Sequence, residues 1–188
     1  MGAARGVDDN GKVAGPATGW VDDLWTAGLM DYFIVEADGS RGRSLKAFGP
    51  GEPQVPSKTT MIAQVAGLDA LHNPLTEDHT HRASLLAQAL EVSLGSAITT
   101  HLFADCLRAQ LQVLRQRWPG ARAVTLLNKS DLLDLGSAGL EIAEDLLAAA
   151  SSPGRAEASS NTVMIPDAVV VSSLREMTFL RVVAAGGD

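Results

Sequence analysis

The segment Asp31-Tyr-Phe-Ile-Val-Glu36-Ala-Asp-Gly-Ser40-Arg-Gly-Arg-Ser-Leu-Lys46 joins an apolar run to an acidic, glycine-containing and basic loop. Its apolar run, Tyr32 to Val35, is typical of a strand buried on both faces of a parallel sheet. Ligands of open α/β sheets bind beyond the carboxyl ends of the strands. A carboxylate there, followed by a glycine that allows close backbone approach, is typical of a site that handles a nucleotide-bound Mg²⁺, so Glu36 and Asp38 are candidate catalytic residues and Gly39 a candidate contact. An Asp/Gly-rich turn after a core strand explains the same residues equally well.

Composition limits the classes of protein to consider. A chain of 188 residues is long enough for one domain with a real core, and a net charge of −7 disfavours a nucleic-acid partner. The single cysteine, Cys106, excludes an internal disulfide and fits a reducing compartment. No apolar run approaches the ~20 residues that cross a bilayer, and residues 1–19 do not resemble a signal peptide. We expect a cytoplasmic protein that binds neither nucleic acid nor membrane.

The chain is predicted to contain a weakly ordered segment, residues 1–19, followed by a single nucleotide-binding-like α/β domain, residues 20–188. A helix is expected over Trp20–Met30, with Gly28 near its end, and a buried strand over Met61–Gly67. Residues 39–58 contain four glycines and three prolines, so they cannot form a regular helix. They form either a phosphate-facing loop or a solvated excursion over the surface.

Helices and strands alternate in the second half of the chain. Helices are expected over residues 82–91, from a cap at Thr99 or Thr100 to about Trp118, and around Leu140–Ala150. Strands are expected at Ala123–Leu127 and Ala168–Val171, with a loop at residues 151–161 and Cys106 as a buried hydrophobe. A helix between two apolar strands is what a parallel βαβ crossover requires, so the class is α/β with a mostly parallel sheet.

Asn128-Lys129-Ser130-Asp131 follows the strand at residues 123–127 and is the second informative site. A carboxylate placed there accepts two hydrogen bonds from the N1–H and amine edge of guanine, which adenine does not offer. Lys129 would cover the base plane and Asn128 would tie neighbouring loops together. The alternative is a helix N-terminus with Asp131 as its cap.

Two further polar groups allow more than one interpretation. Ser172 and Ser173 end the last predicted strand, where a small polar loop can lie against a base or cap a helix over residues 174–184. His79 and His81 stand beside Glu77 and Asp78, but no partner with zinc-site spacing follows. A solvated helix start is favoured there over a metal site.

Several of these motifs together resemble the YqeC family. The resemblance covers about residues 10–135 and rests on segments that occur in the same order, namely residues 31–46, Glu52-Pro53 with Val55-Pro56, Val65–Ala70, His81-Arg82 and Leu127–Asp131. Glu36-x-x-Gly39 also resembles the Glu-x-x-Gly motif of metallochaperone GTPases, where the glutamate works near Mg²⁺ and the attacking water. The resemblance implies a three-layer fold of the P-loop NTPase type.

Members of that family are described as accessory factors for selenium-dependent molybdenum hydroxylases, or as selenium-cofactor biosynthesis proteins. The resemblance implies that Mg²⁺ and GTP are cofactors, and that a molybdenum hydroxylase or a nucleotidyltransferase is a partner. Its contact residues for phosphate, cofactor or base would be Gly39, Arg41, Lys46, His81, Arg82, Asn128, Lys129, Asp131 and Ser172. A non-catalytic scaffold derived from the same fold is the alternative.

One element of the family pattern is absent from this sequence. The family has a glycine-rich phosphate loop with a first strand and helix, whereas residues 1–188 contain no G-x-x-x-x-G-K-[ST]. We therefore expect either an N-terminally shortened version or a degenerate relative, and a GTPase only where that loop is supplied. Without its backbone nest, lysine and hydroxyl ligand, efficient hydrolysis is not expected.

Overall fold

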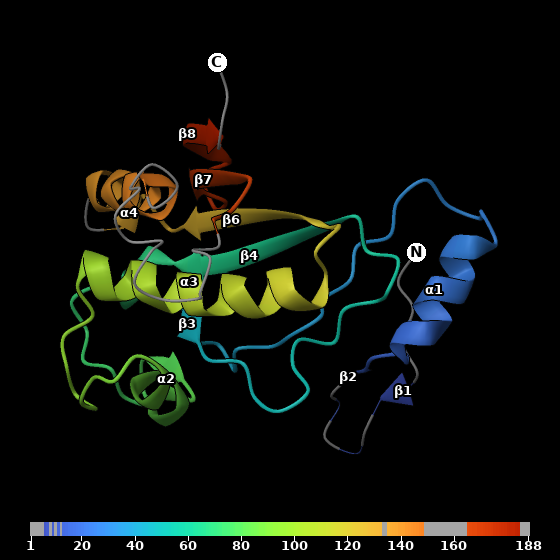
Figure 1. Ribbon diagram of the computed structural model, residues 1–188, viewed down its shortest axis with the longest axis horizontal. Helices are drawn as coiled ribbons and strands as arrows, with labels where there is room; N and C mark the ends of the chain where they lie inside the picture. Colours follow the sequence, from blue (N-terminus) through green and yellow to red (C-terminus); the bar gives the residue numbers. More distant parts are fainter. Residues whose placement is uncertain are drawn as a thin grey trace.

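The protein is an α/β structure in a computed structural model that describes residues 6–7, 9, 11, 13–132, 135–148 and 165–184 (Figure 1). Its elements, in chain order, are β1 Gly6–Val7, β2 Val13–Ala14, α1 Thr18–Thr26, β3 Leu45–Lys46, β4 Met61–Gly67, the 3₁₀ turn η1 Leu68–Ala70, β5 Thr80–His81, α2 Ala83–Ala89, α3 Thr100–Arg117, β6 Arg122–Asn128, α4 Gly136–Ala148, β7 Ala168–Ser173 and β8 Thr178–Ala184.

The central sheet has the strand order β4-β6-β7-β8. β4, β6 and β7 are parallel, with Met61 opposite Arg122 and Val124 opposite Ala168, whereas β8 runs antiparallel to β7. α3 connects β4 to β6 and α4 lies between β6 and β7 in the chain, as parallel crossovers require. The α/β class and the mostly parallel sheet are confirmed.

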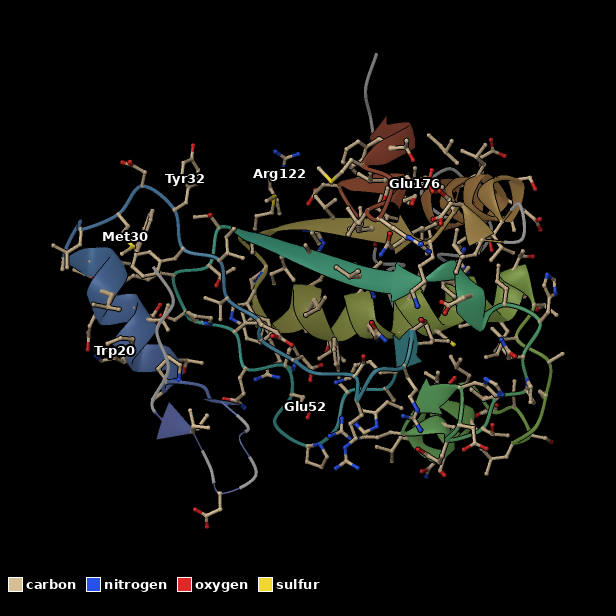
Figure 2. The ribbon with its side chains drawn as sticks, turned by 180° about the vertical axis from the view of Figure 1, so that it is seen from behind. Trp20, Met30, Tyr32, Glu52, Arg122 and Glu176 are labelled. Atoms are coloured by element: carbon tan, nitrogen blue, oxygen red, sulfur yellow. The ribbon has the colours of Figure 1, made fainter. Side chains whose placement is uncertain are left out.

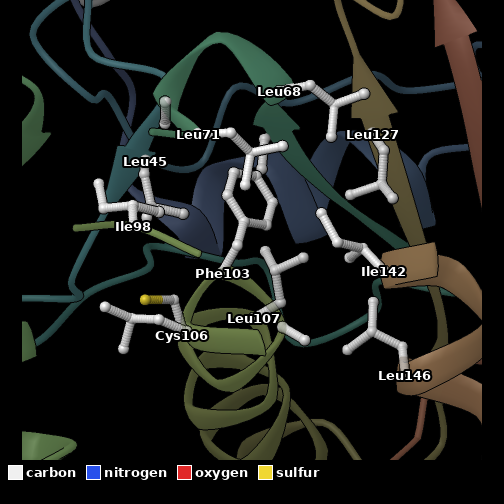
Figure 3. Packing of buried hydrophobic residues seen from close by; sticks show 14 of the residues in the cluster. Leu45, Leu68, Leu71, Ile98, Phe103, Cys106, Leu107, Leu127, Ile142 and Leu146 are labelled. Carbon is white, nitrogen blue, oxygen red and sulfur yellow. The ribbon is translucent and has the colours of Figure 1, made fainter. Parts of the chain in front are cut away.

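Helix α3 forms where its sequence predicts. The Thr99 side chain accepts a hydrogen bond from the Leu102 N–H and caps the first turn, and the helix ends just before Pro119. Its apolar stripe puts Phe103 and Cys106 in a core that is completed by η1, β6 and α4 (Figure 3). Burial raises the pKa of the Cys106 thiol to about 12, so the prediction of a buried hydrophobe is confirmed.

A chain of buried side-chain amides crosses the packed face of the sheet. Gln64 of β4 donates to the Gln110 side chain at 2.9 Å and accepts from the Thr125 hydroxyl at 2.8 Å. Gln110 in turn donates to the Lys46 carbonyl. Because each of these buried groups has a partner, the network fixes α3 and β3 against β4 and β6 without an unpaired polar group.

The predicted strand at Tyr32–Val35 is wrong. Residues 32–40 are extended but pair with no strand within the described residues, and the side chains of Tyr32 and Ile34 are 86% and 99% exposed. An apolar run becomes a buried strand only when neighbouring strands satisfy its backbone, and the described residues supply none to this segment.

The end of the chain also differs from one of its predictions. Residues 174–177 form a turn and 178–184 form β8, so no helix starts at Ser172 and Ser173. Those two serines belong to β7, which extends to residue 173. The loop expected at residues 151–161 and the last residues of the helix expected around Leu140–Ala150 lie outside the described residues, while Gly136–Ala148 confirms most of that helix.

Within the described residues, helices cover one face of the sheet rather than both. α3 and α4 pack together on that face, and the view from behind shows β4 and β6 with no helix of the described chain in front of them (Figure 2). α1 stands to the side, where Asp22 accepts hydrogen bonds from the backbone N–H groups of Ser57 and Lys58. The expected three-layer arrangement is therefore not observed among these residues.

Short elements surround this core. β1 and β2, each of two residues, pair antiparallel in the segment expected to be weakly ordered, and β3 pairs in parallel with β5. Glu77 accepts the backbone N–H of Arg82 and of Ser84 at the start of α2, so the helix predicted over residues 82–91 is present, but it begins after the His79 and His81 segment, where His81 belongs to β5. No helix within the described ranges is long and apolar enough to span a membrane.

Replacing each of two helical glycines by alanine should change stability in opposite directions. A Cβ atom on Gly139 of α4 would lie 2.8 Å from Val171 Cγ1 and 2.9 Å from Leu68 Cδ1, whereas one on Gly19 of α1 meets nothing within 4 Å. We expect Gly139→Ala to lower the free energy of unfolding by about 1–3 kcal/mol through overpacking. Gly19→Ala, the matched control, should raise local helix stability by about 0.5–1 kcal/mol. Urea unfolding measures both, and equal stabilisation by the two variants would contradict the close packing of α4.

Candidate functional site

The candidate site lies where β4, β6 and β7 end. These parallel strands bring Asp69, the 128–131 motif and Ser172 to the same edge of the sheet. Ser44, just before β3, reaches the same edge because its carbonyl accepts the Gly67 N–H at 2.9 Å. We call Ser44, Asp69, Asn128, Lys129, Asp131, Ser172 and Ser173 the motif cluster.

Asn128 and Ser130 attach the motif to the end of β7. The Leu174 N–H donates to Asn128 Oδ1 at 2.9 Å, and the Ser130 N–H donates to the Ser172 carbonyl at 3.1 Å. The predicted role of Asn128, tying neighbouring loops together, is what this geometry provides. The Asn128 side chain and the Ser130 backbone thereby fix the loop, and the next residue, Asp131, is exposed.

Lys129 adopts a left-handed backbone, with φ of 68°. Its ammonium lies 2.7 Å from Asp69 Oδ2 and 2.7 Å from Ser44 Oγ, so it connects the ends of β4 and β6 with the segment before β3. The side chain is 39% exposed, and the pair is only partly shielded from water. Asp69 Oδ1 is buried and has no partner in the described structure, so this corner retains an open acceptor.

Asp131 is exposed and lies in the turn that follows β6. A hydrogen bond from the Ser173 hydroxyl is the main cause that holds the pKa of this carboxyl below its ordinary value, with Arg175 adding to it. α4 begins only at Gly136, so Asp131 does not cap that helix, although Leu132, which follows Asp131 directly, is in a 3₁₀ conformation. Next to it, Ser172 is fully buried, and its hydroxyl has no partner among the described residues.

Gly67 makes the close approach of these groups feasible. A Cβ atom at this position would lie 2.6 Å from both Asp69 Oδ1 and Ser44 Oγ, closer than real side chains approach. Any larger residue would push apart the two groups that hold Lys129. The glycine at the end of β4 is therefore required by the motif cluster and not by its backbone conformation, which is extended.

Two of the basic residues predicted to contact phosphate, Lys46 and Arg82, form a second group with Asp38 and Glu52, which we call the Glu52 cluster. The Lys46 ammonium lies 2.5 Å from Asp38 Oδ1 and 3.3 Å from Glu52 Oε2, and donates to the Gly39 carbonyl. Arg82 binds both oxygens of Glu52, one of them at 2.8 Å. A phosphate would have to displace Glu52 to reach either cation.

Charge and burial set different pKa directions within the Glu52 cluster. The Arg82 hydrogen bonds hold the pKa of Glu52 well below its ordinary value, whereas burial raises that of Asp38 despite Lys46. Burial, followed by the charges of Arg82 and Lys46, lowers the pKa of His81, which favours a neutral imidazole. Asp38 Oδ2 is buried without a partner in the described structure, so Asp38 is the carboxylate here with unused acceptor capacity.

Glu36 and Arg41 are exposed and belong to neither cluster. Glu36 is exposed in the unpaired extended segment, and Arg41 is exposed with φ of 52°. The described part of the chain brings together no group of three or more His, Cys, Asp or Glu side chains that could hold a metal ion. The metal and catalytic roles of Glu36, and the contacts predicted for Gly39 and Arg41, stay predictions.

Sequence reasoning did not assign three residues that the structure brings into the two clusters. Ser44 and Asp69 hold Lys129, and Glu52 pairs with Lys46 and Arg82. All three lie inside the segments that carried the family resemblance, so that signal pointed to them without giving a role. Nothing in the spacing distinguishes Ser44 from the other small residues of its loop.

Because of the Glu52 cluster, we expect the folding stability of the protein to fall at acidic pH. A carboxyl whose pKa falls below its ordinary 4.5 on folding contributes stability that is present above that pH and is lost as the pH falls. Glu52→Gln should remove about 1 kcal/mol at neutral pH, after allowance for solvent screening, and flatten the fall in stability from about pH 6 to about pH 3. The pKa of Asp38 is raised on folding, so its contribution to the pH dependence of stability has the opposite sign and offsets part of this slope.

Urea unfolding at several pH values measures the slope. Glu91→Gln is the control, because it removes an exposed glutamate for which the structure gives no ion pair. An unchanged slope in Glu52→Gln, or an equal change in Glu91→Gln, would show that the cluster does not couple to folding.

Comparisons with known proteins find sequence similarity to one family. A family model described as "YqeC protein" matches residues 1–84. A curated relative from Escherichia coli (strain K12), named "Uncharacterized protein YqeC", is 25% identical over 138 residues, which cover 73% of this chain and 54% of the relative. The chain thus spans about half the length of that relative. No solved structure matches.

Proposed function

Since this chain belongs to the YqeC family, we propose that its motif cluster binds the base of a guanine nucleotide. We further propose that the protein is an accessory factor in the maturation of a selenium-dependent molybdenum hydroxylase. The family membership is the premise of the second statement, and the geometry of residues 128–131 supports the first.

The observation that carries the proposal is the exposed carboxylate of Asp131 on a fixed loop. Asn128 and Ser130 bind the loop to β7, and Ser173 orients the carboxylate by a hydrogen bond that favours its charged form. An ionised carboxylate with free lone pairs is the acceptor that the N1–H and amine of guanine require. Adenine offers no such pair of donors, so the arrangement selects guanine.

The described residues offer fewer contacts to the rest of a nucleotide than to the hydrogen-bonding edge of its base. The Lys129 stem lies beside the same edge and is partly exposed, so it suits contact with a base plane. For Mg²⁺ the described residues offer Glu36 as a single exposed carboxylate, and such an ion commonly relies on one or two carboxylates plus nucleotide phosphates. Mg²⁺ would neutralise phosphate charge, and this chain's own contribution is to hold the base.

A scaffold that binds a partner protein is the second candidate function. It is favoured by the exposed apolar side chains of α1 and the segment that follows, including Trp20, Leu29, Tyr32 and Ile34. Exposed apolar surface of this extent marks a protein interface in soluble domains. The two functions are compatible, because these residues lie apart from the motif cluster.

Titration with fluorescent GDP and ADP analogues in the presence of Mg²⁺ tests the base preference. We expect the GDP analogue to bind with a Kd in the micromolar range and the ADP analogue at least about tenfold more weakly, because only guanine satisfies Asp131. Equal binding of both analogues, or of neither, would contradict guanine recognition. Binding of a hydroxylase or nucleotidyltransferase partner, measured separately, tests the accessory role.

A further inference from the structure

The outer edge of β4 presents backbone groups that no strand of the described chain uses. β4 pairs with β6 on one side only. Within a strand, the N–H and C=O of one residue point to the same side and successive residues alternate. The Arg122 N–H binds the Thr60 carbonyl on the β6 side, and the Gly67 N–H binds Ser44 on the other side. Met61, Ala63 and Val65 therefore point their backbone groups to the open edge.

This edge lacks the features that protect edge strands from pairing. Its sequence, Met61-Ile-Ala-Gln-Val-Ala-Gly67, has no charge and no proline, and its register with β6 runs without a bulge. Natural edge strands are usually shortened, charged, bulged or covered. Met61 and Val65 also expose 57% and 58% of their surface on the face that the helices leave uncovered.

The apolar segment between α1 and β3 is the second half of the same surface. Tyr32 and Ile34 are almost fully exposed, and Phe33 packs edge-on against Trp25 with ring centroids 6.1 Å apart. Trp20, Met30 and Tyr32 are seen on the side of the molecule where β4 begins (Figure 2). An unpaired extended segment and an unprotected edge thus share one side of the protein.

We propose that the open edge of β4 docks one extended, uncharged and apolar polypeptide segment from outside residues 1–188. The exposed backbone groups of residues 61, 63 and 65 specify a β-strand as the occupant, and the neighbouring apolar side chains specify its composition. The relative from Escherichia coli has 46% of its length outside the match, as 100% less the 54% that is covered, so its chain has room for such a segment.

A second copy of this chain is a poorer occupant. Ser44 crosses the edge at Gly67, and α1 is bound through Asp22 to the turn at Ser57 and Lys58, just before β4 begins. The open part of the β4 edge, between the α1 contact and Ser44, has room for one strand. A whole domain approaching it would bring its own α1 and loop to the same place, whereas one strand would not.

Amide hydrogen exchange followed by NMR tests the proposal with defined probes. The full chain is mixed with overlapping peptides of about ten residues, long enough for a strand, that cover the unmatched part of the relative. We expect one region of the peptide set to slow exchange at Met61, Ala63 and Val65 by at least about tenfold. Exchange at Ile62, Gln64 and Ala66, which face β6, should not change.

Ala63→Pro is the deciding variant, because it removes an N–H that the β4–β6 ladder does not use. It should abolish the peptide effect while Ile62, Gln64 and Ala66 keep their protection, which shows that the sheet remains folded. Ala63→Val, the matched control, keeps the N–H and should retain the effect.

Three results would overturn the proposal. The first is slow exchange at Met61, Ala63 and Val65 in the free monomer, which would mean that the edge is already paired within the chain. The second is protection that rises with protein concentration together with dimer formation, which would assign the edge to a second copy. The third is the absence of protection by every peptide. None of these measurements involves a nucleotide, so they are independent of guanine binding.

Discussion

Replacing Asp131 by Asn is expected to reverse the base preference of this chain, from guanine to xanthine nucleotides. Xanthine carries a carbonyl where guanine carries its amine, so it needs a donor where guanine needs an acceptor. The Asn amide supplies that donor at the same place, because Asp131 lies on a loop held by Asn128 and Ser130. Affinity for GDP should fall about 100-fold while affinity for xanthosine diphosphate rises.

Titration of both diphosphates against wild type, Asp131→Asn and Asp131→Ala measures this reversal. Asp131→Ala should lose GDP without gaining the xanthine nucleotide, since alanine offers neither donor nor acceptor. Glu176→Gln is the matched control, because it removes an exposed acidic group from the β7–β8 turn without touching the 128–131 loop. Equal GDP affinity in wild type and Asp131→Asn would exclude this carboxylate as the base contact.

Local sequence signals were sufficient where an element's neighbours are also present in the described chain. α3 has a threonine cap, an apolar stripe and a proline stop, and β4 and β6 are mostly apolar segments that pair with one another. Each of these was predicted within a residue or two. The Asn-Lys-x-Asp motif was found for the same reason, since its position after β6 follows from the strand itself.

The features that sequence could not predict depend on contacts between residues that are far apart in the chain. Tyr32–Val35 has strand-like composition, but a strand needs a neighbour, and none pairs with it in the described structure. Lys46 and Arg82 look like phosphate ligands until Glu52 is seen between them. Residues 174–177 likewise form a turn that lets β8 pair with β7, although the sequence of residues 174–184 is also compatible with a helix.

Phe103→Ala is expected to cause the largest loss of stability. Phe103 is fully buried in the core among Leu45, Leu68 and Leu107 (Figure 3). Truncation removes a large apolar area and leaves a cavity, so the free energy of unfolding should fall by about 4 kcal/mol. Since domains of this size are stable by about 5–15 kcal/mol, the variant should remain folded only at reduced denaturant concentrations. Urea unfolding followed by circular dichroism measures the change in midpoint.

Phe179→Ala makes the same chemical change where the ring is 58% exposed, so it should alter stability by no more than about 1 kcal/mol. The core that Phe103 fills also carries Leu68, next to Asp69, and Leu127, next to Asn128, so it supports both halves of the motif cluster. Folded Phe103→Ala should therefore bind GDP more weakly as urea is added, in proportion to the folded fraction. A small change in its midpoint, similar to that of Phe179→Ala, would mean that the site does not rest on this core.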